Sequence, residues 1–235
     1  MWTIVSYQPV SLISLKLSTA TSTGGKSLLL PTPFAFKMAL LDVILRTLGI
    51  EEGQQLWPAI RDARIALRGP QRIAVTNTFT KILRPNRNWR TPDPDTGLIQ
   101  PMLRTIGFRE YVQWQGVLQV AFLPGNEDVG DWPRWLSMIT YLGKRGGFIQ
   151  AEKVTQAEEL PSGFTPLEPL QDRFPTAGIL QVMDDCAPHL TFEHVDIYSS
   201  RNMKPGKDRL FHQVVIPYRL QKASRGFTLY QRLDV

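Results

Sequence analysis

One stretch of the sequence constrains both the fold and the function of this chain. Residues 18–27 (STATSTGGKS) are small and polar apart from one lysine, and residues 28–49 (LLLPTPFAFKMALLDVILRTLG) contain apolar residues at helical spacing. We expect Thr32 to cap this helix, Pro33 to be its first residue and Gly49 to end it. This order places backbone N–H groups and a cation at a helix N-terminus, where a phosphate group binds well.

The GGKS sequence resembles the end of a nucleotide-binding P-loop but does not fit the whole motif. The motif requires a glycine, four residues, and then Gly-Lys-Ser/Thr. Gly25, Lys26 and Ser27 supply the second half, but the position of the first glycine is Ala20. Three leucines and two prolines also separate the lysine from the helix. We therefore expect the loop to bind a phosphate of another polymer, and the alternative is a surface loop without a ligand.

The charge of the chain points to a negatively charged partner. Among 235 residues the formal net charge is +6 and the pI is about 9.6, and the basic residues are clustered. Nucleic acid is the first candidate partner, against ordinary surface lysine and arginine residues as the alternative. A hydrophobic content of 43% is sufficient for a packed core of one large domain or two small ones.

Cysteine and hydropathy patterns limit the other classes of function. Cys186 is a single cysteine, which excludes an intrachain disulfide and a cysteine zinc site, and we expect a small buried thiol there. The N-terminus is too polar for a signal peptide, and the sequence has no apolar run of 18 residues. We expect a cytoplasmic protein without a membrane partner and without a cofactor.

The order of the expected elements predicts an α+β fold. Up to residue 154 we expect a strand, a helix, two strands, a helix and a strand, which is the βαββαβ order of ferredoxin-like folds. An extra short helix at 54–63 and a long hairpin interrupt this order. The first expected strand covers 2–17 as one long or broken strand that is interrupted near Pro9. The other expected segments are strands 64–67, 72–83, 103–114, 117–123 and 147–154, a helix from the cap Asp131 to Leu142, and short strands near 179–183, 191–198, 211–217 and 227–232.

The central hairpin combines basic and aromatic residues. Such a combination is typical of surfaces that follow a phosphate backbone and stack on bases. Trp89 lies among prolines and arginines, where a core position is difficult to build. The alternative is a solvated hairpin whose aromatic residues return to the core. The basic residues are Arg72, Lys81, Arg84, Arg87, Arg90, Arg104 and Arg109.

A third basic segment follows the second expected helix. Lys144 and Arg145 lie between glycines in the sequence GKRGG, and we include both in the candidate RNA-binding set. The helix dipole alone also explains cations at a helix C-terminus, so this explanation stays open.

Histidines supply the only candidates for catalysis. His194 and His212 are expected on neighbouring strands, where Tyr198 or Lys207 could join them. A metal-independent ribonuclease needs a base for the 2′-hydroxyl and a cation for the developing charge. Structural or surface histidines are the alternative, and no spacing matches a metal-ligand motif.

Two motifs carry a resemblance to a known family. The helix opener of the family is typically Pro-x-Pro-Ser/Thr followed by glycine or alanine, and it appears here at residues 31–37 as PTPFAFK, before an apolar helix that ends in glycine. A later Tyr-x-Gly-Lys followed by an aromatic residue appears as Tyr141, Gly143, Lys144 and Phe148. Together with the order of the elements, the first 155 residues resemble the Cas-five family of CRISPR Cascade subunits, which belongs to the RAMP superfamily of ferredoxin-like (RRM-like) RNA-binding proteins.

This resemblance implies a non-catalytic subunit that binds the guide RNA (crRNA) in antiviral defence. It implies a palm over residues 1–155 that holds the 5′ handle of the RNA near Lys26, Ser27, Lys37 and the Lys144 turn. It also implies an inserted thumb hairpin at about 76–111 and a strand-rich C-terminal extension at 156–235 packed on the palm.

The same resemblance implies the partners of the chain. These are the crRNA 5′ handle, the backbone subunit and the large subunit of a ribonucleoprotein complex, with target DNA within that complex. Some members of the family instead process precursor crRNA as metal-independent endoribonucleases, and this alternative stays open.

Overall fold

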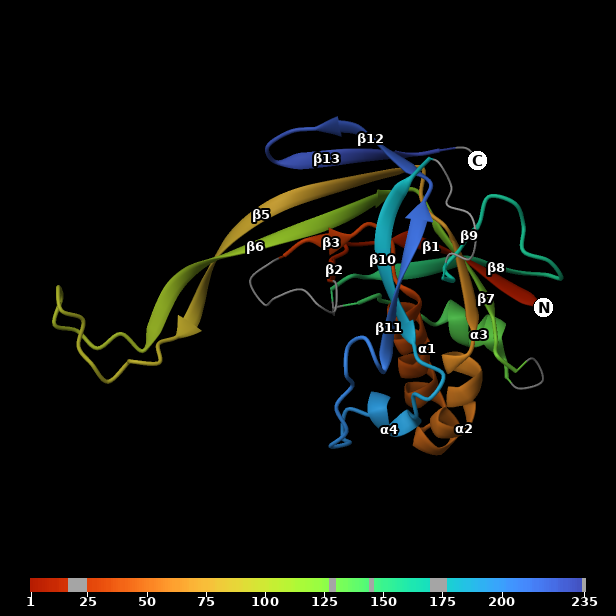
Figure 1. Cartoon of the computed structure of the whole chain (residues 1–235), viewed down its shortest axis with the longest axis horizontal. Helices are drawn as coiled ribbons and strands as arrows, with labels where there is room; N and C mark the ends of the chain where they lie inside the picture. The colour runs from red at the N-terminus through yellow and green to blue at the C-terminus, as the bar shows by residue number, and fades with distance from the viewer. Residues whose placement is uncertain (17–24, 127–129, 144–145, 170–176, 234–235) are drawn as a thin grey trace.

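The computed structural model describes residues 1–16, 25–126, 130–143, 146–169 and 177–233. They form a mixed α+β structure with antiparallel sheets and few helices, so the predicted α+β class is confirmed (Figure 1). The elements are β1 (Trp2–Pro9), β2 (Leu15–Lys16), β3 (Ser27–Leu28), α1 (Pro33–Thr47), α2 (Ile50–Arg61), β4 (Arg64–Arg68), β5 (Arg72–Pro85), β6 (Met102–Gln115), β7 (Leu118–Leu123), α3 (Trp132–Ser137), β8 (Ile149–Ala157), β9 (Thr165–Pro166), β10 (Ile179–Cys186), α4 (Phe192–Val195), β11 (Arg209–Ile216), β12 (Tyr218–Ala223) and β13 (Phe227–Arg232).

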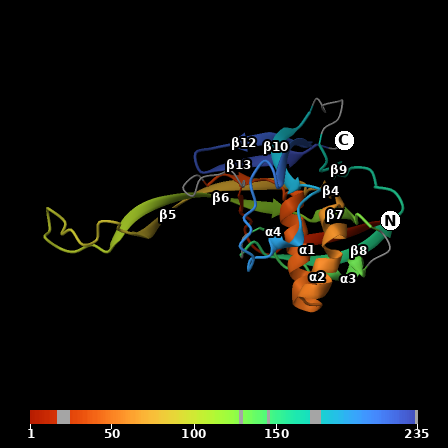
Figure 2. The ribbon, with the colours of Figure 1, turned by 60° about the horizontal axis from the view of Figure 1, so that its bottom comes forward.

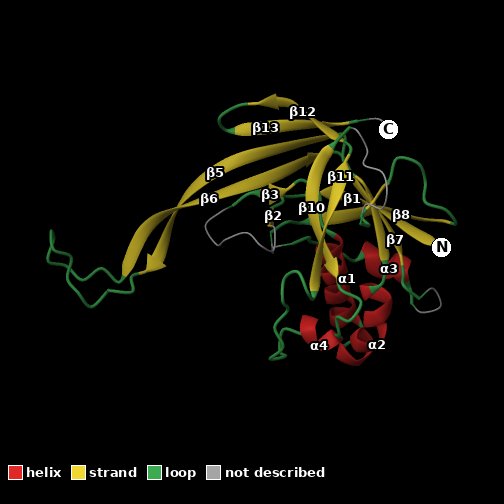
Figure 3. Cartoon of the chain, viewed as in Figure 1, coloured by secondary structure: helices red, strands yellow, loops and turns green. Residues whose placement is uncertain are grey.

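The largest sheet has the strand order β8-β1-β7-β4-β9. Four strands of this sheet follow one another along the chain in the order β1, β4, β7 and β8. Helices α1 and α2 lie between β1 and β4 in the sequence, and α3 lies between β7 and β8. The helices gather on one side of the molecule (Figure 3). Tyr7 is fully buried in β1 and donates its hydroxyl to the carbonyl oxygen of Leu136 at 2.7 Å, which joins the sheet to α3.

Helix α1 begins where the sequence predicts. The Thr32 hydroxyl oxygen accepts a hydrogen bond from the N–H of Ala35 at 3.2 Å, and Pro33 is the first helical residue. Phe36, Leu40 and Ile44 point into the core, as their spacing predicts. Gly49 ends the helix as predicted: Leu48 is the C-cap, and Gly49 follows it with a φ of 109°. The same glycine is the N-cap of α2.

Two predicted segments are wrong in extent or type, and one strand was missed. The helix that begins after Asp131 ends at Ser137, and Thr140 instead pairs with β8: Ile149 N donates to Thr140 O at 2.9 Å. The segment 191–198 contains helix α4 rather than a strand. Strand β12 was not predicted, although it pairs along β13.

The long hairpin is formed by β5 and β6, which pair from Arg72↔Gln115 to Pro85↔Met102. The hairpin projects from the body of the molecule (Figure 2). At its base β13 pairs with β5, and β12 pairs with β13, so the sheet order is β12-β13-β5-β6. The C-terminal strands therefore widen the base of the hairpin.

The hairpin of β10 and β11 is attached to the first part of the chain by side chains that bond the backbone. The amide of Gln181 accepts a hydrogen bond from Leu29 N at 3.0 Å and donates one to Leu30 O at 2.9 Å. On the helical side, Trp57 Nε1 donates to Leu190 O at 2.8 Å. Residues after β8 thus pack directly on the segments around α1 and α2.

A buried lysine completes this attachment. Lys37 is 1% exposed, and its Nζ donates to Asp185 Oδ1 and to Arg61 O, each at 2.7 Å. One amine therefore connects α1, the end of α2 and β10. A buried ammonium group requires such partners, because desolvation of an unpaired charge is costly.

Asp185→Ala tests how much the Lys37–Asp185 ion pair contributes to the stability of the fold. We expect the free energy of unfolding to fall by about 3 kcal/mol, because removing one partner of a buried ion pair typically costs ~3–5 kcal/mol. Arg46→Ala is the control: it breaks the exposed Arg46–Asp42 pair, which should contribute less than about 1 kcal/mol. Urea unfolding followed by tryptophan fluorescence measures both variants, and equal losses would contradict the role of Lys37.

Candidate nucleic-acid interface

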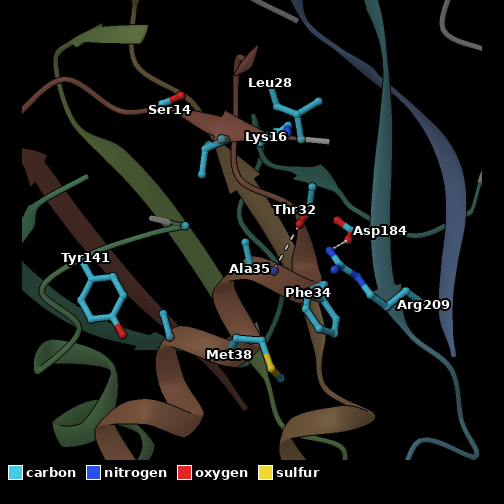
Figure 4. Close-up of a pocket in the computed structure, with 13 residues that line it drawn as sticks. Ser14, Lys16, Leu28, Thr32, Phe34, Ala35, Met38, Tyr141, Asp184 and Arg209 are labelled. Carbon is cyan, nitrogen blue, oxygen red and sulfur yellow. Dashed lines mark hydrogen bonds and ion pairs between the residues drawn. The ribbon is translucent and has the colours of Figure 1, made fainter. Parts of the chain in front are cut away.

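The N-terminus of α1 borders a cavity of about 290 Å³ (Figure 4). Its lining includes Ser14, Lys16, Thr32, Tyr141 and Arg209. The volume is close to the lower end of ligand pockets, which measure about 300–1,000 Å³, so it suits a nucleobase or a phosphate better than a larger group. The positive end of the helix dipole and Lys16 both favour a negatively charged group here.

One wall of the cavity is an arginine held from two sides. The Arg209 guanidinium lies 3.9 Å from the centre of the Phe34 ring and forms an ion pair with Asp184, whose side chain is 7% exposed. Asp184 compensates the charge of Arg209. Arg209 therefore contributes to the shape of the wall more than to the positive charge of the cavity. No local pattern predicts this cluster, since its three members lie far apart along the chain.

The glycine-lysine segment is bound to the base of the hairpin. Gly25 O accepts a hydrogen bond from Glu110 N at 2.7 Å, and Ser27 N donates to Glu110 Oε2 at 2.9 Å. Ser27 Oγ also accepts from Leu15 N at 2.9 Å. Ser27 therefore holds the segment in place, whereas the neighbouring Lys26 is exposed beside the hairpin. Residues 18–24 of the predicted phosphate loop lie outside the described residues.

The prediction that Lys37 contacts RNA is corrected by its environment. The side chain is buried among α1, α2 and β10 and its amine bonds Asp185 and Arg61 O. A cation in this position does not reach a polymer at the surface. Burial raises the pKa of Asp185, an effect that the Lys37 charge opposes.

Most of the basic residues that the sequence predicts to bind RNA are exposed on the hairpin. Arg72, Lys81, Arg84, Arg87, Arg90 and Arg104 are exposed, and Arg109 is half-buried. Trp89 is 45% exposed, with the guanidinium carbon of Arg90 5.4 Å from the centre of its ring. The alternative that the aromatic residues return to the core does not apply to Trp89 or to Phe79, which is 70% exposed.

The tip of the hairpin is built from hydrogen-bonded turns. Asn86 N donates to Pro101 O at 2.9 Å, and the Asn86 amide donates to Gln100 O at 2.8 Å. Asp93 Oδ1 accepts from the N–H and the hydroxyl of Thr96, at 2.9 and 3.0 Å. These hydrogen bonds lower the pKa of Asp93. The hydrogen-bonded turns therefore define the backbone conformation of the tip that carries Trp89 and its flanking arginines.

The three histidines have separate partners. His212 Nε2 lies 3.0 Å from Leu167 O, whereas His194 Nδ1 lies 2.8 Å from the Thr191 hydroxyl in the capping box of α4. His189 Nε2 lies 3.0 Å from Asp208 Oδ1. The expected placement of His194 and His212 on neighbouring strands is therefore wrong. Tyr198 and Lys207 are exposed on the segment between α4 and β11.

The remaining candidates are a turn and a thiol. Lys144 and Arg145 lie outside the described residues. Cys186 is buried, and burial raises the pKa of its thiol to about 12, so the thiol stays protonated at neutral pH. Within the described ranges, no three His, Cys, Asp or Glu side chains are grouped so that they could hold a metal ion.

Comparison with known proteins relates the whole chain to the CRISPR system. A CRISPR-associated protein Cas5 from Archaeoglobus fulgidus is 24% identical over 231 residues, which cover 95% of this chain and 96% of that protein. The chain is thus similar to a Cas5 protein over nearly its full length. The resemblance to the Cas-five family that the sequence suggested is thereby confirmed.

A solved structure has a similar fold. The crystal structure of a CRISPR protein from Archaeoglobus fulgidus matches with a TM-score of 0.50 and 14% identity, over 99% of this chain and 92% of that one. No family model matches the sequence. None of the helices in the described part of the chain has the length and hydropathy needed to cross a membrane.

Gly25→Ala tests the contact between the loop and the hairpin. A Cβ at Gly25 would lie 2.1 Å from the backbone oxygen of Phe108, which cannot rotate away. We expect a loss of about 1–3 kcal/mol in the free energy of unfolding, typical of overpacking. Gly226→Ala is the matched control, since nothing lies within 4 Å of its Cβ position. Similar unfolding curves for the two variants would show that Gly25 is not closely packed.

Proposed function

We propose that the chain is a non-catalytic crRNA-binding subunit of a CRISPR Cascade complex and that it caps the 5′ handle of the guide RNA. The observation that carries this proposal is the arrangement of exposed cations on the β5–β6 hairpin beside Lys26 and the N-terminus of α1, in a chain related to Cas5 over nearly its full length. Both features favour a phosphate polymer.

The fold assignment within this proposal is a ferredoxin-like RAMP palm. The order β1, α1, β4, β7, α3, β8, with the neighbouring strands β8-β1-β7-β4 all antiparallel, supports it. The β5–β6 hairpin would then be the thumb, inserted between the second and third strands of the palm. Its exposed tip would contact the adjacent backbone subunit, while the palm would hold the handle.

The setting of the proposal is a cytoplasmic complex. Its further partners are the large subunit and, through the assembled complex, target DNA. These assignments follow from the relation to Cas5 and are tested by co-expression with the neighbouring genes. Purification of the chain without such partners, together with no preference for RNA that carries a 5′ handle, would contradict them.

The proposal assigns no catalytic step to the chain. The separate environments of His194 and His212 support this, because a 2′-hydroxyl reaction needs its base and its cation at one site. The test is incubation of the protein with labelled repeat RNA in a metal chelator. Discrete cleavage that disappears in His194→Ala or His212→Ala would establish the endoribonuclease alternative instead.

The hairpin's part in RNA binding is tested by charge removal. We expect Arg84→Gln/Arg87→Gln/Arg90→Gln to weaken binding of handle-bearing RNA and to reduce the slope of log K against log salt by about 2, at ~0.7 per phosphate contact of a single strand. Fluorescence anisotropy from 50 to 300 mM salt, about the physiological range, measures this slope. The control Arg46→Gln/Arg134→Gln/Lys153→Gln removes the same charge from α1, α3 and β8 and should leave the slope unchanged. An unchanged slope in the hairpin variant would remove the hairpin from the interface.

A further inference from the structure

The sheet β12-β13-β5-β6 has one buried side and one solvent-facing side. Residues directly opposite each other in an antiparallel sheet lie on the same side, and successive residues alternate. Ile73, Val75, Val112 and Trp114 are buried in the core. The residues between them therefore face outward, on the side of the molecule away from the helices (Figures 1 and 2).

The pairing register gives the composition of this outward side, which we call the outer sheet face. It consists of three rows across the strands. The rows are Arg219, Gln231, Arg72 and Gln115; then Lys222, Leu229, Ala74 and Gln113; then Phe227, Thr76 and Tyr111. The bulge between Leu220 and Lys222 brings Lys222 onto the same side as Arg219.

The outer sheet face is positively charged. Arg72, Arg219 and Lys222 are exposed on it, and Arg72 Nε donates to Gln231 Oε1 at 3.2 Å. Among the described residues of the four strands, Glu110 is the acidic one. Glu110 lies on the other side of the sheet, opposite Asn77, and its carboxylate accepts from Ser27 N. The face thus has cations without acids to neutralise them.

Two aromatic residues stand in the third row. Phe227 and Tyr111 both pair with Thr76, so they lie about 10 Å apart, at two strand spacings of ~4.8 Å. Both are half-buried, and the small residues Thr76 and Ala74 leave the sheet surface between them low. Aromatic rings fixed on a sheet and surrounded by cations and amides suit the stacking of bases from a single strand.

We propose that the outer sheet face binds single-stranded nucleic acid, with bases stacked on Tyr111 and Phe227 and phosphates bound by Arg72, Arg219 and Lys222. This rests on the proposed function only for the identity of the strand, which would be the guide RNA where it continues past the hairpin. Arg109 and Thr78 occupy the next row toward the tip, so the face and the hairpin form one continuous surface. RNA and single-stranded DNA share the recognised chemistry, and the test separates them.

The experiment measures binding of three probes by fluorescence anisotropy. The probes are handle-bearing repeat RNA, a dodecamer of uridine and a dodecamer of thymidine. Tyr111→Ala/Phe227→Ala should raise Kd at least about tenfold, since each stacked base is worth ~1–3 kcal/mol and 1.4 kcal/mol is a factor of ten. Tyr111→Phe/Phe227→Tyr keeps both rings and should retain wild-type affinity. Urea unfolding of each variant separates lost contacts from lost folding.

A second variant set tests the phosphate contacts. Arg72→Gln/Arg219→Gln/Lys222→Gln should reduce the salt slope by about 2, as expected for three single-strand phosphate contacts. The same-charge control Arg46→Gln/Arg134→Gln/Lys153→Gln should not change it. The dodecamer that the wild-type protein binds more tightly identifies RNA or DNA as the strand.

The outcomes separate this proposal from the proposed function. Folded outer-face variants that bind all probes like the wild type would overturn the proposal, even where the hairpin variant loses the handle RNA. Dodecamer binding that depends on the outer sheet face, without preference for handle-bearing RNA, would support the proposal and contradict the 5′-handle function. A wild-type protein that binds none of the probes would overturn both.

Discussion

The buried amine of Lys37 is the contact on which the relative positions of the helices and the C-terminal strands depend. A charged group with 1% exposure is tolerated only where its partners are fixed, and here they are Asp185 and the carbonyl of Arg61. The neighbouring residue Asp184 then holds Arg209 against Phe34 at the wall of the cavity. One wall of the cavity at α1 is therefore held from inside the molecule, by β10.

The positive charge of the chain is concentrated by the fold. Several basic residues of the body of the molecule form ion pairs, as in Arg61–Asp62, Arg64–Glu168 and Arg209–Asp184. The hairpin and the outer sheet face carry their cations without such partners among the described side chains of the same surface. The net charge of +6 is thus not spread evenly, and an approaching polyanion meets its strongest attraction along β5, β6 and β12.

Local signals in the sequence were sufficient for the elements that depend on local interactions. Thr32 and Pro33 define the start of α1, and alternation of apolar residues predicts β5 and β6. The predictions from the sequence were wrong where contacts between distant residues determine the structure. Lys37 has its acidic partner 148 positions later, and nothing near it in sequence signals burial. The helix α4 depends on a capping box within a segment whose apolar residues also suit a strand.

The same distinction explains why the candidate interface was only partly predictable. The sequence predicts that the arginines of the turn-rich tip are exposed, because a segment of this composition offers no position in the core. The outer sheet face requires the register of four strands from two distant parts of the chain. Phe227 and Tyr111 come together only because both pair with Thr76. At the base, β13 supports β5 and the Gly25 segment supports β6, whereas beyond Thr78 the hairpin has two strands alone in the described structure. A two-stranded ribbon is marginally stable by itself, so the basic tip depends on this base for the position from which it meets a ligand.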